Sequence, residues 1–223
     1  MTGASPPSTP ANLFLVVALN RIYLIRHAEV ENPRHVLYGH LPGFPLSARG
    51  RRQAAEVGRR LRQAGIVTIV HSPLERAQET ARIINAELAE PARLEVDPKL
   101  REAEFSRYLQ GVPYWLIPVR RPLWLVHRAR RGLLPGDEPF DVLGGRVLEV
   151  MRRIAGQQPG PPAALVSHAD PLGAAWMLLE DRPRSEREMM RKVVDRAAML
   201  EVDLTDGEVT AVAYVPPPVL SDA

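Results

Sequence analysis

The feature that most constrains the fold is an alternation of short β-branched or apolar runs with longer segments whose apolar residues recur at helical spacing. Residues 21–25 (RIYLI), 66–70 (IVTIV) and 163–166 (AALV) are such runs. Continuous runs of this kind are typical of strands buried on both faces of a parallel sheet. The helical stripes cover 48–64, 74–88, 143–154 and 172–179. The pattern predicts an α/β fold, a three-layer α/β/α sandwich with a mostly parallel central sheet.

The ends of the chain differ from this pattern. Residues 199–204 and 209–215 flank a Thr-Asp-Gly-Glu turn and are predicted to form a hairpin. We expect one domain over 20–215, preceded by a tail and an apolar arm (1–19) and followed by a short tail (216–223). The apolar run within 11–19 is too short to span a bilayer and is expected to be an extra strand or a packed arm.

Composition excludes several kinds of chemistry. The 223 residues contain no cysteine, which excludes disulfides, thiolate metal sites and cysteine nucleophiles and fits a reducing compartment, so we expect the cytoplasm. All basic residues except Lys99 and Lys192 are arginine, but the net charge is only +3. That charge is compatible with an anionic substrate, and no nucleic-acid partner is expected.

Polar residues follow three of the predicted parallel strands. Arg26-His27-Ala28-Glu29 follows the first, His71-Ser72 the second and Ser167-His168-Ala169-Asp170 the third. Because parallel strands end at one edge of a sheet, where ligands bind, these side chains are expected to converge.

The second of these segments also resembles a helix start. Ser72 is expected to cap the helix, with Pro73 in its first position and Glu75 completing a capping box. Arg76 would then lie in the first turn, near free backbone amides and the positive end of the helix dipole, where an anion binds.

These residues belong to a longer pattern, and the chain resembles the histidine phosphatase superfamily in its phosphoglycerate-mutase-like branch. The resemblance runs from about residue 20 to about 215. The matching motifs, in order, are Arg26-His27-Ala28-Glu29 with Asn32, then Gly39, Pro45-Leu46-Ser47, Gly50 and Gln53-Ala54, then Ser72 to Ala81, Leu100-Arg101-Glu102 and Ser167-His168.

The resemblance implies a role for each matching position. His27 would be the nucleophile that takes the phosphoryl group, and Glu102 the proton donor that later activates water. Phosphoryl oxygens would be bound by Arg26, Arg76 and His168, with Asn32 lining the phosphate pocket. A neutral imidazole is a competent nucleophile, and arginine matches phosphate bidentately. The resemblance implies no metal and no cofactor, since the arginines supply the positive charge.

The sequence departs from the family pattern at several positions. Ala28 replaces the usual glycine. His71 stands where serine is common and either adds a third imidazole or packs beside the pocket. Asp170 either orients a pocket histidine or caps the helix that follows, the second being favoured. Glu104 is the alternative acid to Glu102, since alternation would place both on one face of an extended segment.

Residues 105–135, which we call the insertion, resemble the family least. They mix aromatic residues, leucines and arginines. A packed helical insertion or a lid over the pocket is favoured over membrane-surface contact through 112–131 or a homodimer contact. His35, His40 and His127 have no motif support.

The leading interpretation is a metal-independent phosphatase that hydrolyses a small phosphomonoester through a phosphohistidine on His27. A phosphoglycerate mutase uses the same intermediate, but the 66-position step from Glu102 to His168 is short for one. An inactive binding or scaffold module on the same fold is the third interpretation.

Overall fold

The computed structural model describes residues 19–156 and 161–220 and has a six-stranded sheet at its centre. The strand order is β3-β2-β4-β1-β5-β6. Strands β3, β2, β4 and β1 are parallel, β5 pairs antiparallel with β1, and β6 pairs antiparallel with β5. The strands are β1 (Leu19–Arg26), β2 (Thr68–His71), β3 (Arg93–Val96), β4 (Ala163–Ser167), β5 (Met199–Thr205) and β6 (Glu208–Val215).

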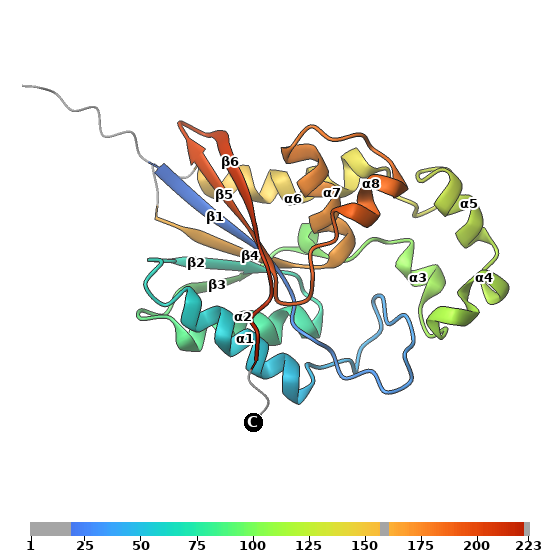
Figure 1. Cartoon of the computed structure of the whole chain (residues 1–223), viewed down its shortest axis with the longest axis horizontal. Helices are drawn as coiled ribbons and strands as arrows, with labels where there is room; N and C mark the ends of the chain where they lie inside the picture. Colours follow the sequence, from blue (N-terminus) through green and yellow to red (C-terminus); the bar gives the residue numbers. More distant parts are fainter. Residues whose placement is uncertain (1–18, 157–160, 221–223) are drawn as a thin grey trace, which may run out of the picture.

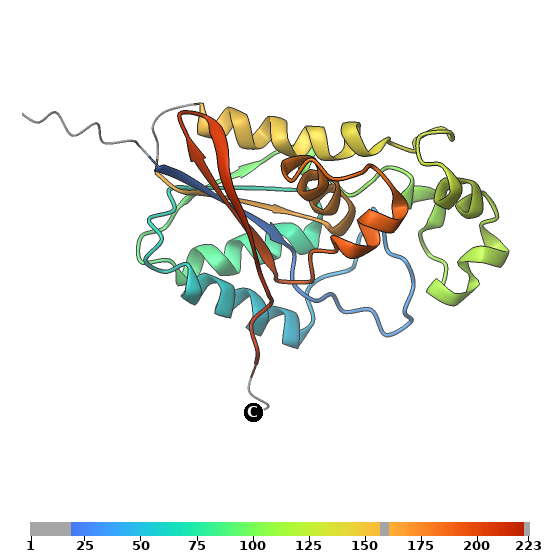
Figure 2. The same cartoon turned by 45° about the horizontal axis from the view of Figure 1, so that its top comes forward.

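Helices cover both faces of this sheet, so the predicted three-layer α/β/α sandwich is confirmed (Figure 1). Figure 2 shows α1 and α2 on one side, with α6 and α7 on the other. The helices are α1 (Ala48–Arg60), α2 (Glu75–Glu87), α3 (Ser106–Leu109), α4 (Ile117–Arg120), α5 (Leu123–Ala129), α6 (Phe140–Ala155), α7 (Ala169–Leu179) and α8 (Glu186–Arg191), with 3-10 turns η1 (Pro98–Leu100) and η2 (Tyr114–Leu116).

The core follows the periodicity of the sequence. Buried residues of α1 and α2 pack against one face of the sheet, and those of α6 and α7 against the other. Ile25 and Val166 lie in the first cluster, whereas Leu24 and Leu165 lie in the second. Alternate residues of β1 and β4 therefore serve opposite layers, which is why these strands are apolar throughout.

The hairpin turn is set by two residues with positive φ, Asp206 at 52° and Gly207 at 84°. Two consecutive left-handed residues make the tight turn that matches the twist of paired strands. The strands on either side are β5 and β6, as the sequence predicts.

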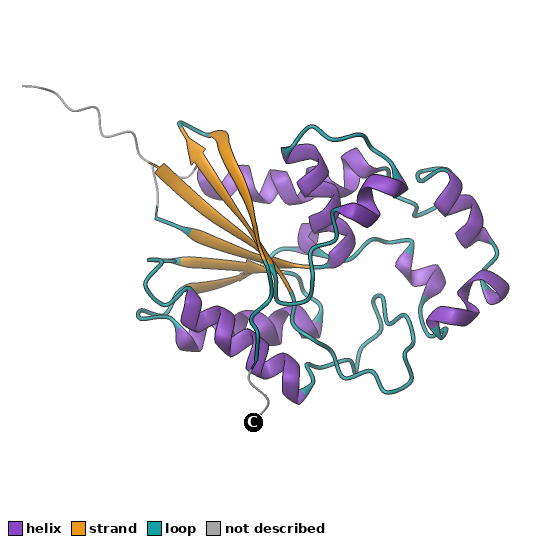
Figure 3. Ribbon diagram, viewed as in Figure 1, coloured by secondary structure: helices purple, strands orange, loops and turns teal. Residues whose placement is uncertain are grey.

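The insertion forms a lobe beside the sandwich. Its short helices α3, α4 and α5 lie away from the sheet, joined by loops (Figure 3). Phe105, Leu109, Val112 and Ile117 form a small apolar cluster within the lobe. Among the described residues, no helix is long and apolar enough to cross a membrane, and the apolar run at 11–18 lies outside the described residues.

Candidate active site

The register of the sheet brings the polar strand ends together. Parallel pairing places Arg26 of β1 beside Ser167 of β4, and His71 of β2 beside Val166. The backbone N–H of His27 donates to the carbonyl of Ser167 at 3.0 Å. Because β4 lies between β2 and β1, the segments that carry His27, Ser72 and His168 meet at one edge.

His27 is buried, and its hydrogen bonds define its tautomer. Its Nδ1 lies 2.8 Å from the carbonyl oxygen of Ala28, so Nδ1 carries the proton and donates it. On the other side of the ring, Nε of Arg76 donates to Nε2 of His27 at 3.2 Å. Nε2 therefore presents its lone pair. Burial first, then the positive charges of Arg76 and Arg26, hold the pKa of His27 well below its usual value.

Arg76 lies in the first turn of α2, as the sequence predicts, and is 2% exposed. Besides the bond to His27, it donates to the carbonyl of Gly39 at 2.9 Å. Its guanidinium lies 4.7 Å from the centre of the Tyr38 ring. These contacts fix the plane of the guanidinium next to the imidazole, the position in which an arginine can bind two oxygens of a phosphoryl group.

The predicted capping of α2 is wrong in detail. Leu74 is the cap residue and the helix has no side-chain cap bond. Instead of completing a capping box, Glu75 accepts from the backbone N–H of Gly43. The Ser72 hydroxyl accepts a hydrogen bond from the backbone N–H of Leu74 and is hydrogen-bonded to His168. It therefore belongs to the site and does not cap the helix.

His168 is fully buried, with its ring 5.1 Å from that of His27. Its Nε2 lies 2.8 Å from the Ser72 hydroxyl, whereas its Nδ1 is buried with no partner among the described residues. Burial, followed by Arg76 and His27, lowers the pKa of His168 well below its usual value. Nε of Arg26 is likewise buried without a described partner. Buried polar atoms are nearly always bonded, so two such atoms at neighbouring strand ends indicate a place for a ligand.

Glu102 and Glu104 do not share a face, contrary to the expectation from alternation. The chain turns at residue 104, just before α3 begins. Glu102 lines a cavity of about 240 Å³ together with Arg26 and Arg76. Glu104 lies outside that cavity, 2.6 Å from Arg107. Although its partial burial acts in the opposite direction, the hydrogen bond from Arg107 lowers the pKa of Glu104.

The electrostatics of Glu102 suit proton transfer. Burial, and then the neighbouring Asp170 carboxylate, raise the pKa of Glu102 to about 7. A carboxyl group with such a pKa is present in both protonation states near neutrality. It can therefore give a proton in one step and take one in the next.

Asp170 does not cap α7. His168 is the cap residue, and no side chain makes a cap bond at this helix. Asp170 lies in the first turn, lines the same cavity and lies 3.4 Å from Arg131 of the insertion. The expectation that Asp170 caps the helix is therefore wrong. Its side chain faces Arg131, a basic residue distant in sequence.

Asn32 and His71, two further positions singled out in the sequence, do not line the cavity. Both amide atoms of Asn32 are bonded to the backbone of Val36, so its side chain shapes the loop, and its place in a phosphate pocket stays a prediction. His71 is buried in β2 and its Nδ1 is bonded to the carbonyl of Ser72 at 2.9 Å.

His40 is a residue that sequence reasoning missed. Its Nε2 lies 3.1 Å from the carbonyl of Glu102 and 3.3 Å from that of Ala103, so the imidazole donates to the segment that carries the carboxyl group. No local pattern indicates this role, because the two segments are 62 positions apart in the chain.

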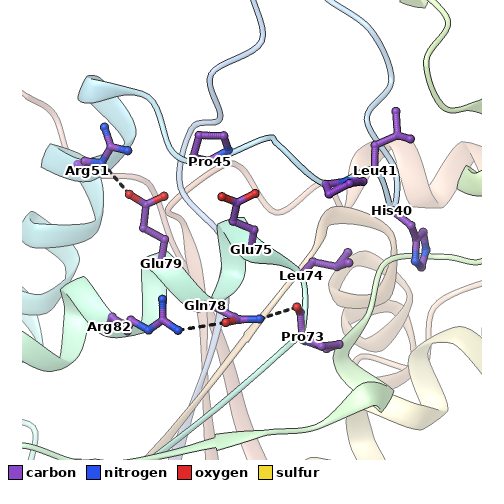
Figure 4. Close-up of a pocket in the computed structure, with 11 residues that line it drawn as sticks. His40, Leu41, Pro45, Arg51, Pro73, Leu74, Glu75, Gln78, Glu79 and Arg82 are labelled. Carbon is purple, nitrogen blue, oxygen red and sulfur yellow. Dashed lines mark hydrogen bonds and ion pairs between the residues drawn. The ribbon is translucent and has the colours of Figure 1, made fainter.

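A second, larger depression of about 680 Å³ lies beside His40 and the start of α2 (Figure 4). Its charged groups already have partners within the protein: Arg51 pairs with Glu79 at 2.6 Å, and Arg82 donates to Gln78. The buried histidines lie elsewhere. The smaller cavity is the candidate active site, because Glu102 and Arg76 line it and Arg76 is hydrogen-bonded to His27.

A fold of this topology with paired imidazoles and arginines at the strand ends defines a class of phosphoryl-transfer protein. The chain belongs to the histidine phosphatase superfamily, branch 1, whose family model matches residues 22–215. Members of this superfamily are phosphatases or mutases.

The relatives similar in sequence include an uncharacterized protein and a probable mutase. The chain is 36% identical to the uncharacterized protein Rv0525 of Mycobacterium tuberculosis over 163 residues, which are 71% of this chain and 76% of that protein. It is 32% identical to a probable phosphoglycerate mutase, GpmB of Yersinia enterocolitica, over 76% of this chain and 79% of the relative.

Solved structures share the fold. The alpha-ribazole phosphatase of Shigella flexneri superposes with a TM-score of 0.71 at 25% identity, over 90% of this chain and 100% of the other. A mycobacterial glucosyl-3-phosphoglycerate phosphatase gives a TM-score of 0.70 at 23% identity, over 89% of this chain and 98% of the other, which shows the fold alone.

Proposed function

We propose that this protein is a phosphoric monoester hydrolase that works through a phosphohistidine on His27 without a metal. One observation carries the proposal: the Nδ1 proton of His27 is held by the Ala28 carbonyl, so the buried Nε2 lone pair faces Arg76. A neutral imidazole with a fixed lone pair is the form that attacks phosphorus.

In the first step, Nε2 of His27 forms a bond to phosphorus as the ester P–O bond breaks. Glu102, in its protonated form, gives its proton to the departing oxygen, and the alcohol leaves. Arg76 turns its Nε–H from the imidazole to a phosphoryl oxygen. Arg26 and His168 supply the donors that are unpartnered in the described structure. A loose phosphoryl transition state needs mainly this alignment and positive charge.

In the second step, the Glu102 carboxylate takes a proton from water while the water oxygen attacks phosphorus. The N–P bond breaks, its electron pair returns to Nε2, and inorganic phosphate is released. Metal independence rests on the arginines, which supply the positive charge that a phosphoryl group requires.

The test compares His27→Asn with a matched control, His35→Asn. His35 is exposed and has a φ of 48°, a conformation that asparagine tolerates. With p-nitrophenyl phosphate in EDTA, wild type and the control should release phosphate, and His27→Asn should not. An acid-labile, base-stable phosphoenzyme should form only when His27 is present. Equal turnover by His27→Asn would overturn the mechanism.

Phosphoglycerate mutase activity is the second candidate, favoured by the name of the relative at 32% identity. It predicts interconversion of 2- and 3-phosphoglycerate with little release of phosphate. An inactive binding module is the third candidate: it predicts phosphate binding without turnover on any phosphomonoester.

The remaining expectations stand as proposals of the same kind. The partner is a small phosphorylated substrate and not a nucleic acid, and the compartment is the cytoplasm. Membrane contact through 112–131 and a homodimer each have a direct test, in co-sedimentation with anionic vesicles and in sedimentation velocity.

A further inference from the structure

The cavity that contains Glu102 is closed on one side by a histidine of the insertion. His127 lies on α5 and lines this cavity with Arg26, Arg76 and Glu102. It is only 6% exposed. The mechanism above gives it no role, and no motif of the sequence indicates one.

Two contacts hold the imidazole of His127 in one orientation. Nδ1 lies 2.7 Å from Oδ1 of Asp137, whose side chain is fully buried. The ring also stacks on Phe105, with centres 4.3 Å apart and planes 12° from parallel. The stacking fixes the plane of the ring and the carboxylate fixes its rotation, in the way that carboxylates orient functional histidines.

The contact with Asp137 occupies Nδ1 of the His127 ring and leaves Nε2 free of it. Nε2 of His127 has no hydrogen-bond partner among the described residues, and it is not among the buried polar atoms that lack one. Since His127 lines the cavity, Nε2 is the ring nitrogen left to bond a ligand there. A rigid ring with one free nitrogen offers a hydrogen bond whose position is set before any ligand binds.

The rest of the cavity wall is largely apolar and aromatic. Leu37, Tyr38, Phe105, Leu109 and Tyr114 line it together with the arginines and His127. Its volume of about 240 Å³ is small for a ligand site. The small volume suits a compact leaving group and not a long chain or an oligomer, and the aromatic rings of Tyr38, Phe105 and Tyr114 favour a flat one that can pack against them.

We propose that His127, positioned by Asp137, is a specificity-determining residue whose Nε2 binds an oxygen on the leaving group. The substrate is then a compact, flat phosphomonoester with an apolar body and one hydrogen-bonding oxygen remote from the phosphoryl group. This inference rests on the proposed function for the position of the phosphoryl group, which the Arg26 and Arg76 side of the cavity binds.

The test measures binding with phosphonates, which cannot be hydrolysed. Phenylphosphonate is compared with its 2-, 3- and 4-hydroxy derivatives by titration calorimetry on the full chain. One hydrogen bond to the ring should make the best isomer bind about three- to tenfold tighter than phenylphosphonate. Near-equal affinity for all four compounds, or no binding by any of them, would overturn the proposal.

Variants distinguish recognition of the leaving group by His127 from a purely structural role of the His127–Asp137 pair. His127→Phe retains an aromatic ring against Phe105 and should reduce the affinity ratio to about one. His127→Gln, which can place an amide near Nε2, should restore part of it. Asp137→Asn should lower the ratio by loosening the ring. Leu125→Ala, at a 56% exposed position of the same helix, is the matched control and should keep the ratio.

Thermal unfolding of each variant identifies a folding defect, and retention of the wild-type ratio in a folded His127→Phe variant contradicts the proposal. Turnover of phenyl phosphate is measured in parallel on wild type and His27→Asn. Because binding is read without hydrolysis, absent turnover counts against the proposed function, whereas a lost affinity difference counts against the role of His127.

Discussion

The hydroxyl of Ser72 lies 2.8 Å from Nε2 of His168 and also accepts the backbone N–H of Leu74 at 3.2 Å. The hydroxyl proton is then directed to the imidazole. A donor on this side leaves the ring proton on Nδ1, the nitrogen that has no described partner. The serine before α2 thus selects the tautomer in which His168 can donate to a phosphoryl oxygen.

Ser72→Ala should therefore lower kcat by about tenfold, the effect of losing roughly one hydrogen bond's worth of transition-state stabilisation. KM should change less, because Arg26 and Arg76 remain. Steady-state kinetics with p-nitrophenyl phosphate measure both constants. An unchanged kcat in a folded variant would show that His168 needs no orientation by Ser72.

The pH dependence of turnover should follow Glu102. Its pKa of about 7 means that the protonated form is lost as pH rises through neutrality. For alkyl phosphates, whose leaving oxygen needs that proton, kcat/KM should fall above about pH 7. The pKa of His27 is lowered, so loss of the nucleophile by protonation should appear only well below pH 6.5. A pH–rate profile from 4 to 9 measures both limbs.

Glu102→Gln should remove the alkaline limb and slow alkyl phosphates more than p-nitrophenyl phosphate, whose leaving group needs little protonation. An alkaline limb that persists in Glu102→Gln would assign it to another group. The same comparison on Glu104→Gln serves as the control, since Glu104 lies outside the cavity.

His40 should act on the reaction through Glu102. His40→Ala removes the bonds to the carbonyls of Glu102 and Ala103, so kcat for alkyl phosphates should fall about tenfold while p-nitrophenyl phosphate is affected less. The alkaline limb should also shift, a change that simple destabilisation would not produce. His40→Gln, which can still donate, should recover part of the rate; equal loss on both substrates would contradict the positioning role.

Two adjacent glycines of α6 give a matched stability test. A Cβ on Gly144 would lie 2.6 Å from the backbone carbon of Ala174, whereas a Cβ on Gly145 meets nothing within 4 Å. Gly144→Ala should lower the free energy of unfolding by about 2 kcal/mol, since α6 and α7 must separate. Gly145→Ala should raise it by about 0.5 to 1 kcal/mol. Urea unfolding measures both, and similar values would contradict the close approach of the helices.

The sandwich could be predicted from sequence because its signal is local. Buried strands such as β1 and β4 are continuous apolar runs, and amphipathic helices such as α6 repeat every three or four residues. β3 (Arg93–Val96) was missed because it lies at the sheet edge and is largely exposed, so it has no apolar run. A packed helical insertion was among the favoured expectations for 105–135, but the bounds of its short helices were not predicted, because prolines interrupt any periodicity there.

Sheet topology predicts the site only where residues lie directly at strand ends; Arg76 was placed by the expected start of a helix, and Glu102 by the family resemblance. Arg26, His27 and His168 follow buried strands, so sheet topology alone brings them together. The roles of His40, Asp170 and His127 depend on contacts between segments far apart in the chain. Asp170 shows the limit most clearly, because its local pattern resembles a helix cap, while its neighbour in space is Arg131 of the insertion.

The separate lobe formed by the insertion has a consequence for engineering. The nucleophile His27 follows a strand of the sheet, whereas His127 lies on α5 and stacks on Phe105, which belongs with Leu109 to the apolar cluster of the lobe. The sandwich and the insertion could therefore be exchanged independently of one another. Grafting a different 105–135 segment onto this sandwich should exchange the preferred substrate while leaving the reaction chemistry in place.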